Sequence, residues 1–145
     1  MTDIALMKGQ QREIAEIAVT VRSMLTAQQL AVPTIAKIAR QLLCELCEKM
    51  QDHLAAEHSG LYPALLTHPD QDIKNLAWGF INNDKPLRRE FADYAKYWLK
   101  DCDFVFTDAF LHETHEMLEA LDHRLDLERN SMLPRLERRG VFAQA

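Results

Sequence analysis

The chain has little glycine and proline, few cysteines and no excess of basic residues. Its 145 residues include 4 Gly, 5 Pro and 3 Cys. Three cysteines are an odd number and too few for the disulfide framework of a small secreted domain, so we expect a reducing, cytoplasmic setting. The 17 Lys and Arg stand against 22 Asp and Glu, a formal net charge of −5. This balance lacks the positive footprint of a nucleic-acid-binding protein, and we expect no nucleic acid as a partner.

Long hydrophobic runs are also missing. Nowhere do the roughly 18 consecutive apolar residues that mark a membrane-spanning helix occur. The first eight residues contain no basic segment followed by an apolar run, which is the pattern of an export signal. We therefore expect no membrane contact and a single domain over residues 1–145. A chain of this length buries a core without disulfides or a stapling metal.

Four long stretches carry apolar residues at spacings of three and four, and no strand-like alternation competes with them. They predict helices over residues 3–29, 33–66, 70–100 and 103–139. The third helix is either continuous or broken across residues 82–86, where Pro86 stands. Helices of similar length with short connections favour an all-α, up-down-up-down four-helix bundle.

Local residues place the ends and bends of these helices. Asp3 is well placed to cap the first helix, and Pro33 follows its end. Pro63 is expected to bend the last turns of the second helix. Gly140 supplies the C-terminal stop of the fourth helix.

Two segments of the chain repeat a local pattern. Residues 53–66 read HLAAEHSGLYPALL and residues 124–137 read RLDLERNSMLPRLE. Each contains a glutamate, Glu57 or Glu128, six residues before a proline. The second and fourth predicted helices therefore share a motif.

The two glutamates of this motif are predicted to face the core. At about 100° per residue, Glu57 falls on the apolar side of its helix and His53 on the flank one turn earlier. Glu128 projects near the centre of the apolar stripe of the fourth helix. A buried carboxylate needs a cation, a hydrogen-bond network or a proton, because its desolvation alone is costly.

Two alternative partners could neutralise these carboxylates. A metal pair bridged by both carboxylates, with imidazoles from nearby helices, is how four-helix di-iron sites are built. A salt bridge is the other answer, because Arg124 lies four residues before Glu128 on the same side of the helix.

The run from His53 to Leu66, the four-helix layout and the Glu128-x5-Pro134 segment resemble the hemerythrin-like (HHE cation-binding) domains over most of the chain. The resemblance implies a di-iron centre inside the bundle, held in that family by five histidines and two bridging carboxylates. It further implies a role in oxygen, redox or nitric oxide sensing, or in iron handling, with oxygen or nitric oxide as the small ligand. By motif position His53, Glu57 and Glu128 would be metal ligands.

The chain departs from the family pattern at several positions. Gln11 stands on the inner face of the first helix, where the family usually offers histidine, and the third helix contains no histidine. Arg124 occupies the histidine position of the second motif. His123 lies one residue off this position but remains a candidate ligand through a local bulge, since a five-residue spacing occurs in some family members. His58 is a further candidate beside the inner stripe, or a polar edge residue. The resemblance therefore implies an altered or degraded di-iron site.

A metal-free alternative is a polar core network of Gln11, Glu57, Arg124 and Glu128 in a bundle that regulates other proteins by contact. The runs DHLAAEHSGLY and EALDHRLDLERNSML also resemble the regulator of sigma D family of helical anti-sigma proteins, which implies a sigma factor as partner.

No other motif indicates chemistry. Cys44 and Cys47 form a C-x-x-C one helical turn apart, without a second pair or a strand-to-helix context, and are read as small apolar residues. No glycine-rich phosphate loop and no nucleophile with a general base emerge. We therefore expect a binding protein and not an enzyme.

Overall fold

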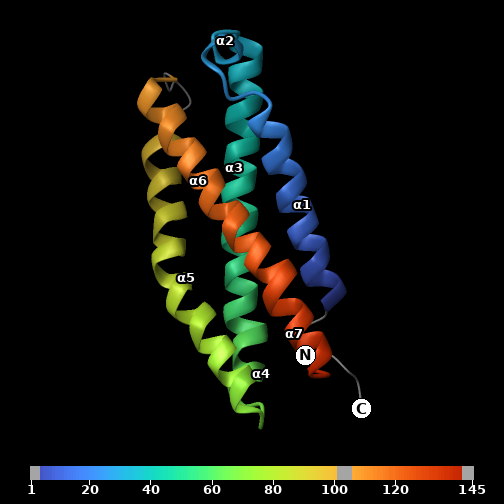
Figure 1. Cartoon of the computed structure of the whole chain (residues 1–145). Coiled ribbons are helices and arrows are strands. Elements are labelled where there is room, and N and C mark those ends of the chain that lie inside the picture. The colour runs from blue at the N-terminus through green and yellow to red at the C-terminus, as the bar shows by residue number, and fades with distance from the viewer. Residues whose placement is uncertain (1–3, 101–105, 142–145) are drawn as a thin grey trace.

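The computed structural model describes residues 4–100 and 106–141. Four long helices lie side by side and alternate in direction (Figure 1): α1 (Ile4–Arg22), α3 (Pro33–Ala56), α5 (Gln71–Trp98) and α6 (Asp108–Leu127). Helix α1 packs against α3 and α6, and α5 also packs against both. The four helices therefore close into a ring, and the prediction of an all-helical bundle is confirmed for the described residues.

The first predicted helix is wrong at its end. Helix α1 stops at Arg22, and a separate short helix, α2 (Ala27–Leu30), follows. The side chain of Thr26 caps α2, because its Oγ1 accepts a hydrogen bond from the backbone N–H of Gln29 at 3.2 Å. A capping residue in extended conformation cannot also continue the preceding helix, so one predicted helix becomes two.

The third predicted helix is continuous. Pro86 lies inside α5 and removes one backbone hydrogen bond, yet the helix does not break. Phe80 and Phe91 on either side of Pro86 are both buried. Their packing against the core holds the two halves of α5 in one helix, so tertiary contacts override the local effect of proline.

The fourth helix begins later than predicted. Thr107 caps α6 by accepting a hydrogen bond from the backbone N–H of Phe110 at 3.1 Å, so α6 starts at Asp108. The predicted start at Asp103 and the predicted cap Asp3 lie outside the described residues. Gly140 has a φ of 70°, a left-handed conformation that ends the helix as predicted.

The repeated sequence motif becomes a repeated structure. A five-residue π-helical turn follows α3 as η1 (Glu57–Leu61), and another follows α6 as η2 (Glu128–Met132). Short α-helices continue them as α4 (Tyr62–Leu66) and α7 (Leu133–Arg138). In each case the N–H just before the proline bonds to the carbonyl of the glutamate, five residues back. Proline has no N–H and its ring crowds the carbonyl four residues back, and the wider turn accommodates both effects.

The apolar interior consists of two clusters. The larger lies at the α2 end of the bundle and includes Leu46, Phe91 and Leu118. The smaller lies at the opposite end and includes Met7, Leu65 and Leu136. The buried charged and amide side chains fall where the two clusters meet, as Gln11 does between Met7 and Ile14 on α1, whereas the buried Thr114 lies within the larger cluster. A polar layer therefore crosses the whole bundle.

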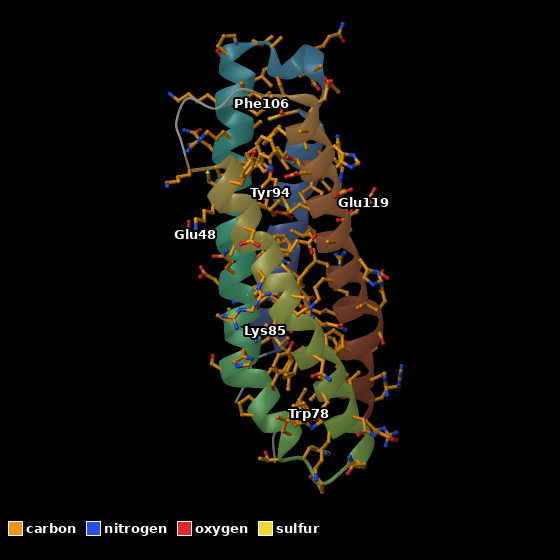
Figure 2. All side chains as sticks on the ribbon, turned by 90° about the vertical axis from the view of Figure 1, so that its left-hand side faces the viewer. Glu48, Trp78, Lys85, Tyr94, Phe106 and Glu119 are labelled. Carbon is orange, nitrogen blue, oxygen red and sulfur yellow. The ribbon has the colours of Figure 1, made fainter. Side chains whose placement is uncertain are left out.

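Charged side chains cover the outside of the helices. Figure 2 shows Glu48 and Glu119 on outer faces, whereas Tyr94 lies between helices. Among the described residues, none of the helices is both long enough and apolar enough to cross a membrane.

A matched pair of leucines tests the packing of the core. Leu46 is fully buried and Leu6 is 60% exposed. We expect Leu46→Ala to lower the free energy of unfolding by about 2–5 kcal/mol, because it removes buried methyl groups and leaves a cavity. Leu6→Ala should change it by less than about 0.5 kcal/mol. Urea unfolding followed by circular dichroism measures both, and equal losses would contradict the helix phases described above.

Candidate functional site

The polar layer between the two apolar clusters is the candidate site. All four long helices contribute to it or lead into it, and each member is at most 4% exposed: Gln11, His53, Glu57, Asp84, Arg124 and Glu128. The helical spacing that buries the apolar stripes also buries these residues, because they occupy stripe positions themselves. Their desolvation must be compensated inside the layer.

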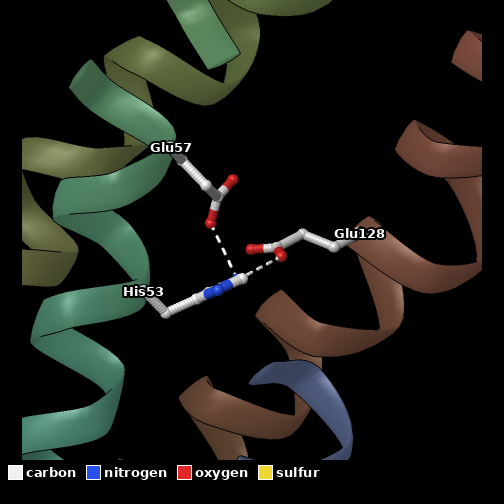
Figure 3. Close-up of side chains that lie close together, drawn as sticks. All are labelled: His53, Glu57 and Glu128. Carbon is white, nitrogen blue, oxygen red and sulfur yellow. Dashed lines mark hydrogen bonds and ion pairs between the residues drawn. The ribbon is translucent and has the colours of Figure 1, made fainter. Parts of the chain in front are cut away.

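The imidazole ring of His53 points one end toward the carboxylates of both Glu57 and Glu128 (Figure 3). Its Nε2 is 2.7 Å from Glu128 Oε1 and 2.9 Å from Glu57 Oε1. The other ring nitrogen, Nδ1, is 2.8 Å from the side-chain oxygen of Gln10. An Nδ1–H that donates to Gln10 leaves Nε2 to face the carboxylates, where it carries either a proton or a metal ion.

Arg124 contacts the other carboxylate oxygen, Oε2, of the same two glutamates. We call these Oε2 atoms the outer oxygens and the Oε1 atoms that face His53 the inner oxygens. Its Nε donates to Glu128 Oε2 at 2.6 Å, and its Nη2 lies 3.3 Å from Glu57 Oε2. Nη2 also donates to the Tyr62 hydroxyl at 2.8 Å, and Nη1 is paired with Asp84 Oδ1 at 2.7 Å. Three helices thus surround one guanidinium with oxygen atoms.

Some buried oxygen atoms of the layer lack a hydrogen-bond donor among the described residues. They include Glu57 Oε1 and Gln11 Oε1. Glu57 Oε1 is in ion-pair contact with Nε2 of His53 at 2.9 Å, and the same nitrogen lies closer to Glu128 Oε1, at 2.7 Å. Gln11 uses its amide nitrogen to donate to Glu128 Oε1 at 3.0 Å. Oxygen atoms buried without donors fit a cation better than an apolar core.

The surroundings shift the protonation of the three central residues. Burial disfavours charge on His53, but hydrogen bonding and charge from both glutamates overcome it and raise its pKa to about 10. Burial raises the pKa of Glu57 to about 7, despite the opposing effect of His53. Burial also acts on Glu128, yet His53 and Arg124 hold its pKa down to about 2. The two glutamates differ because Glu128 accepts short hydrogen bonds from three side chains.

The charges of the layer leave a place for a divalent ion. Three carboxylates face one guanidinium, so with a neutral His53 the layer carries two excess negative charges. Two protons, one on His53 and one on Glu57, neutralise it. One divalent cation bound to His53 Nε2, Glu57 and Glu128 does the same. The ligand atoms of these three residues lie within 4.8 Å of one another, which suits a single ion.

The structure brings together most of the residues proposed from the sequence. His53, Glu57 and Glu128 form the centre, with Gln11 and Arg124 in contact. His58 and His123 are exposed and contribute nothing to the layer, contrary to the expectation that either could ligate. A bulge is present on this helix, but it begins only at Glu128 and so does not turn His123 inward. His58 directly follows the inward-facing Glu57 in the chain and points outward.

Three members of the site were missed from the sequence. Gln10 and Tyr62 contact it from α1 and α4, and Asp84 pairs with Arg124 from α5. Asp84 was detectable, since it follows Phe80 by four residues on the inner face of a continuous helix. A helix broken across residues 82–86 would not keep Asp84 in phase with Phe80, and the sequence analysis left this alternative open. No local signal distinguishes Gln10 or Tyr62.

Comparisons with known proteins returned no match. No protein-family model, no curated protein and no solved structure matches this chain. The resemblance to the hemerythrin-like domains therefore stays a prediction carried by the residues that suggested it. The contacts of the polar layer are the observations from which a function can be argued.

Removal of Arg124 should be costly when no metal is present. Arg124→Met leaves the buried carboxylates without their guanidinium, and we expect the free energy of unfolding to fall by about 3–5 kcal/mol in buffer with a chelator. Arg129→Met serves as the matched control, because Arg129 is exposed in the adjoining π-turn. Urea unfolding measures both variants. An unchanged stability of Arg124→Met would show that the layer does not depend on the guanidinium.

The charge on His53 should make stability depend on pH. Its pKa is raised from 6.5 to about 10 on folding, so its contribution is complete below pH 6.5 and is lost as pH rises to about 10. In chelator we expect unfolding free energy to fall by at least about 2 kcal/mol between pH 6.5 and 10. His53→Gln should flatten this decline, and His112→Gln, at an exposed position, should keep it. Parallel curves for all three proteins would refute the assignment.

Proposed function

We propose that the chain is a hemerythrin-like metal-binding module that holds one divalent ion at His53, Glu57 and Glu128. The observation that carries the proposal is the convergence of three ligand atoms from two helices on one buried point, with Gln10 placed to orient the imidazole. Iron is the ion that the resemblance implies, and one imidazole with two carboxylates is a donor set that suits it.

The residues of the chain perform separate tasks in this proposal. Gln10 accepts from Nδ1 of His53 and so presents Nε2 to the ion. Arg124 holds the outer oxygens of both glutamates and thereby orients their inner oxygens toward His53. The apolar clusters on both sides of the layer exclude water.

An ion held by only three protein ligands keeps open coordination positions. Bound iron would supply there a place for a small ligand such as oxygen or nitric oxide. The proposal is therefore one of binding, in oxygen, redox or nitric oxide sensing or in iron handling, and not one of catalysis.

A second candidate is the metal-free bundle that regulates a partner protein by contact, as an anti-sigma protein does. The observation in its favour is that the layer can neutralise itself. Arg124 and a protonated His53 face the three carboxylates, and the raised pKa of Glu57 lets a further proton complete the balance.

Elemental analysis separates the two candidates. Protein is produced in iron-supplemented medium and purified without chelator or affinity-tag histidines, and its metal content is read beside its absorption spectrum. We expect about one metal ion per chain. Glu57→Ala and Glu128→Ala should each abolish binding because each removes a ligand, whereas the exposed His112→Ala should not. Metal-free wild-type protein with a featureless spectrum would support the second candidate, and unchanged metal content in both glutamate variants would refute the first.

A further inference from the structure

The two halves of the site are built from the same motif. His53 and Glu57 stand four residues apart and the π-turn η1 starts at Glu57; Arg124 and Glu128 stand four residues apart and η2 starts at Glu128. Tyr62-Pro63 and Leu133-Pro134 follow the two turns at matching positions. Arg124 is thus the structural equivalent of His53 in the second half of the repeat.

Each half of the repeat places a nitrogen-bearing side chain between the two glutamates. His53 Nε2 lies between the Oε1 atoms, at 2.7 and 2.9 Å. The Arg124 guanidinium lies between the Oε2 atoms, at 2.6 and 3.3 Å. The pair of carboxylates therefore has two cation positions on opposite sides, and one of them is filled by a charge that is covalently part of the chain.

We propose that Arg124 is a tethered second cation that fills a guanidinium-shaped pocket, and that it limits the cluster to one exchangeable ion. The pocket belongs to the fold itself, whereas the claim about the exchangeable ion rests on the proposed function. A di-iron centre does not fit the residues present, because the guanidinium occupies the position between the outer oxygens where a second bridged ion would lie.

The surroundings of Arg124 match a planar guanidinium and not a metal ion. Asp84 pairs with Nη1, the Tyr62 hydroxyl accepts from Nη2, and the Phe80 ring centroid lies 4.7 Å from Cζ. A ring stacked on a delocalised cation and oxygens at several of its nitrogens are the usual features of an arginine site. Asp84 and Phe80 come from α5, outside the repeat, so a helix that carries neither motif completes the pocket.

Solvent can reach this pocket once the side chain is shortened. Arg124 and Phe80 line a groove of about 740 Å³ between α5 and the α6–α7 segment, together with Ala120 and Leu127. Arg124→Ala should therefore create a cavity that opens to solvent and retains the oxygen atoms of Asp84, Glu57 and Glu128. A free guanidinium ion has the shape and charge to enter it.

Chemical rescue tests the pocket without any metal. The Arg124→Ala protein is melted in chelator with millimolar guanidinium chloride, with urea at equal concentration as the neutral isostere and sodium chloride for ionic strength. We expect guanidinium alone to raise the melting midpoint by at least about 4 °C. Wild type and the exposed-site control Arg129→Ala should show no rise. If Arg124→Ala is unfolded, the readout is the recovery of helical circular dichroism on addition of guanidinium.

Ion stoichiometry tests the limit to one ion. Arg124→His turns the second half of the repeat into a copy of the first, and equilibrium dialysis with Mn²⁺ should give about two ions per chain against about one for wild type. Rescue by guanidinium with no metal bound to wild type would reject the proposed function and keep the guanidinium pocket. No selective rescue of Arg124→Ala, or two ions bound by wild type, would overturn the inference.

Discussion

The structure depends on the compensation of two glutamates that the bundle buries almost completely in one layer. Glu57 and Glu128 are 2% and 0% exposed, so bulk solvent does not stabilise their charge. Every other member of the layer pairs with these carboxylates or with the arginine that does. His53 contacts the inner oxygens, Arg124 the outer ones, and Asp84 in turn balances the guanidinium. A polar layer so closely paired also aligns the four helices, because a shift of one helix along its axis would separate charged partners.

The same constraint connects stability to function. Under the proposed function, either protons or one divalent ion would neutralise the excess negative charge of the layer, and both would use Nε2 of His53. Protons and the proposed metal ion would therefore compete for one position. The two apolar clusters contain no member of the polar layer, so they pack without an ion. Their burial of apolar surface stabilises the bundle and offsets the cost of burying polar side chains between them.

The repeated motif explains how one chain builds both sides of the cluster. The prolines at positions 63 and 134 each accompany a π-turn that starts at the glutamate, and this turn sets the phase of the residues that follow. Tyr62 reaches the layer because it lies five residues after Glu57, the spacing of a π-turn and not of an α-helix. The repeat was visible in the sequence as a pattern. Its conversion into two wide turns was not, since the expected effect of Pro63 was only a bend.

Periodicity by itself determined the all-helical bundle and the inward positions of Glu57 and Glu128, because spacing along a helix is a local property of the chain. It also placed His53 within one turn of Glu57. It left open whether Arg124 or His123 faces the site, and the structure decides for Arg124. Only the tertiary structure decided the partners that come from other helices: Asp84 with Arg124, Gln10 with His53, and Tyr62 with both halves of the site. Likewise, the continuity of α5 through Pro86 and the outward direction of His58 and His123 followed from packing. Contacts between helices depend on their relative height and rotation, and these are set when the two apolar clusters close, not by any single segment.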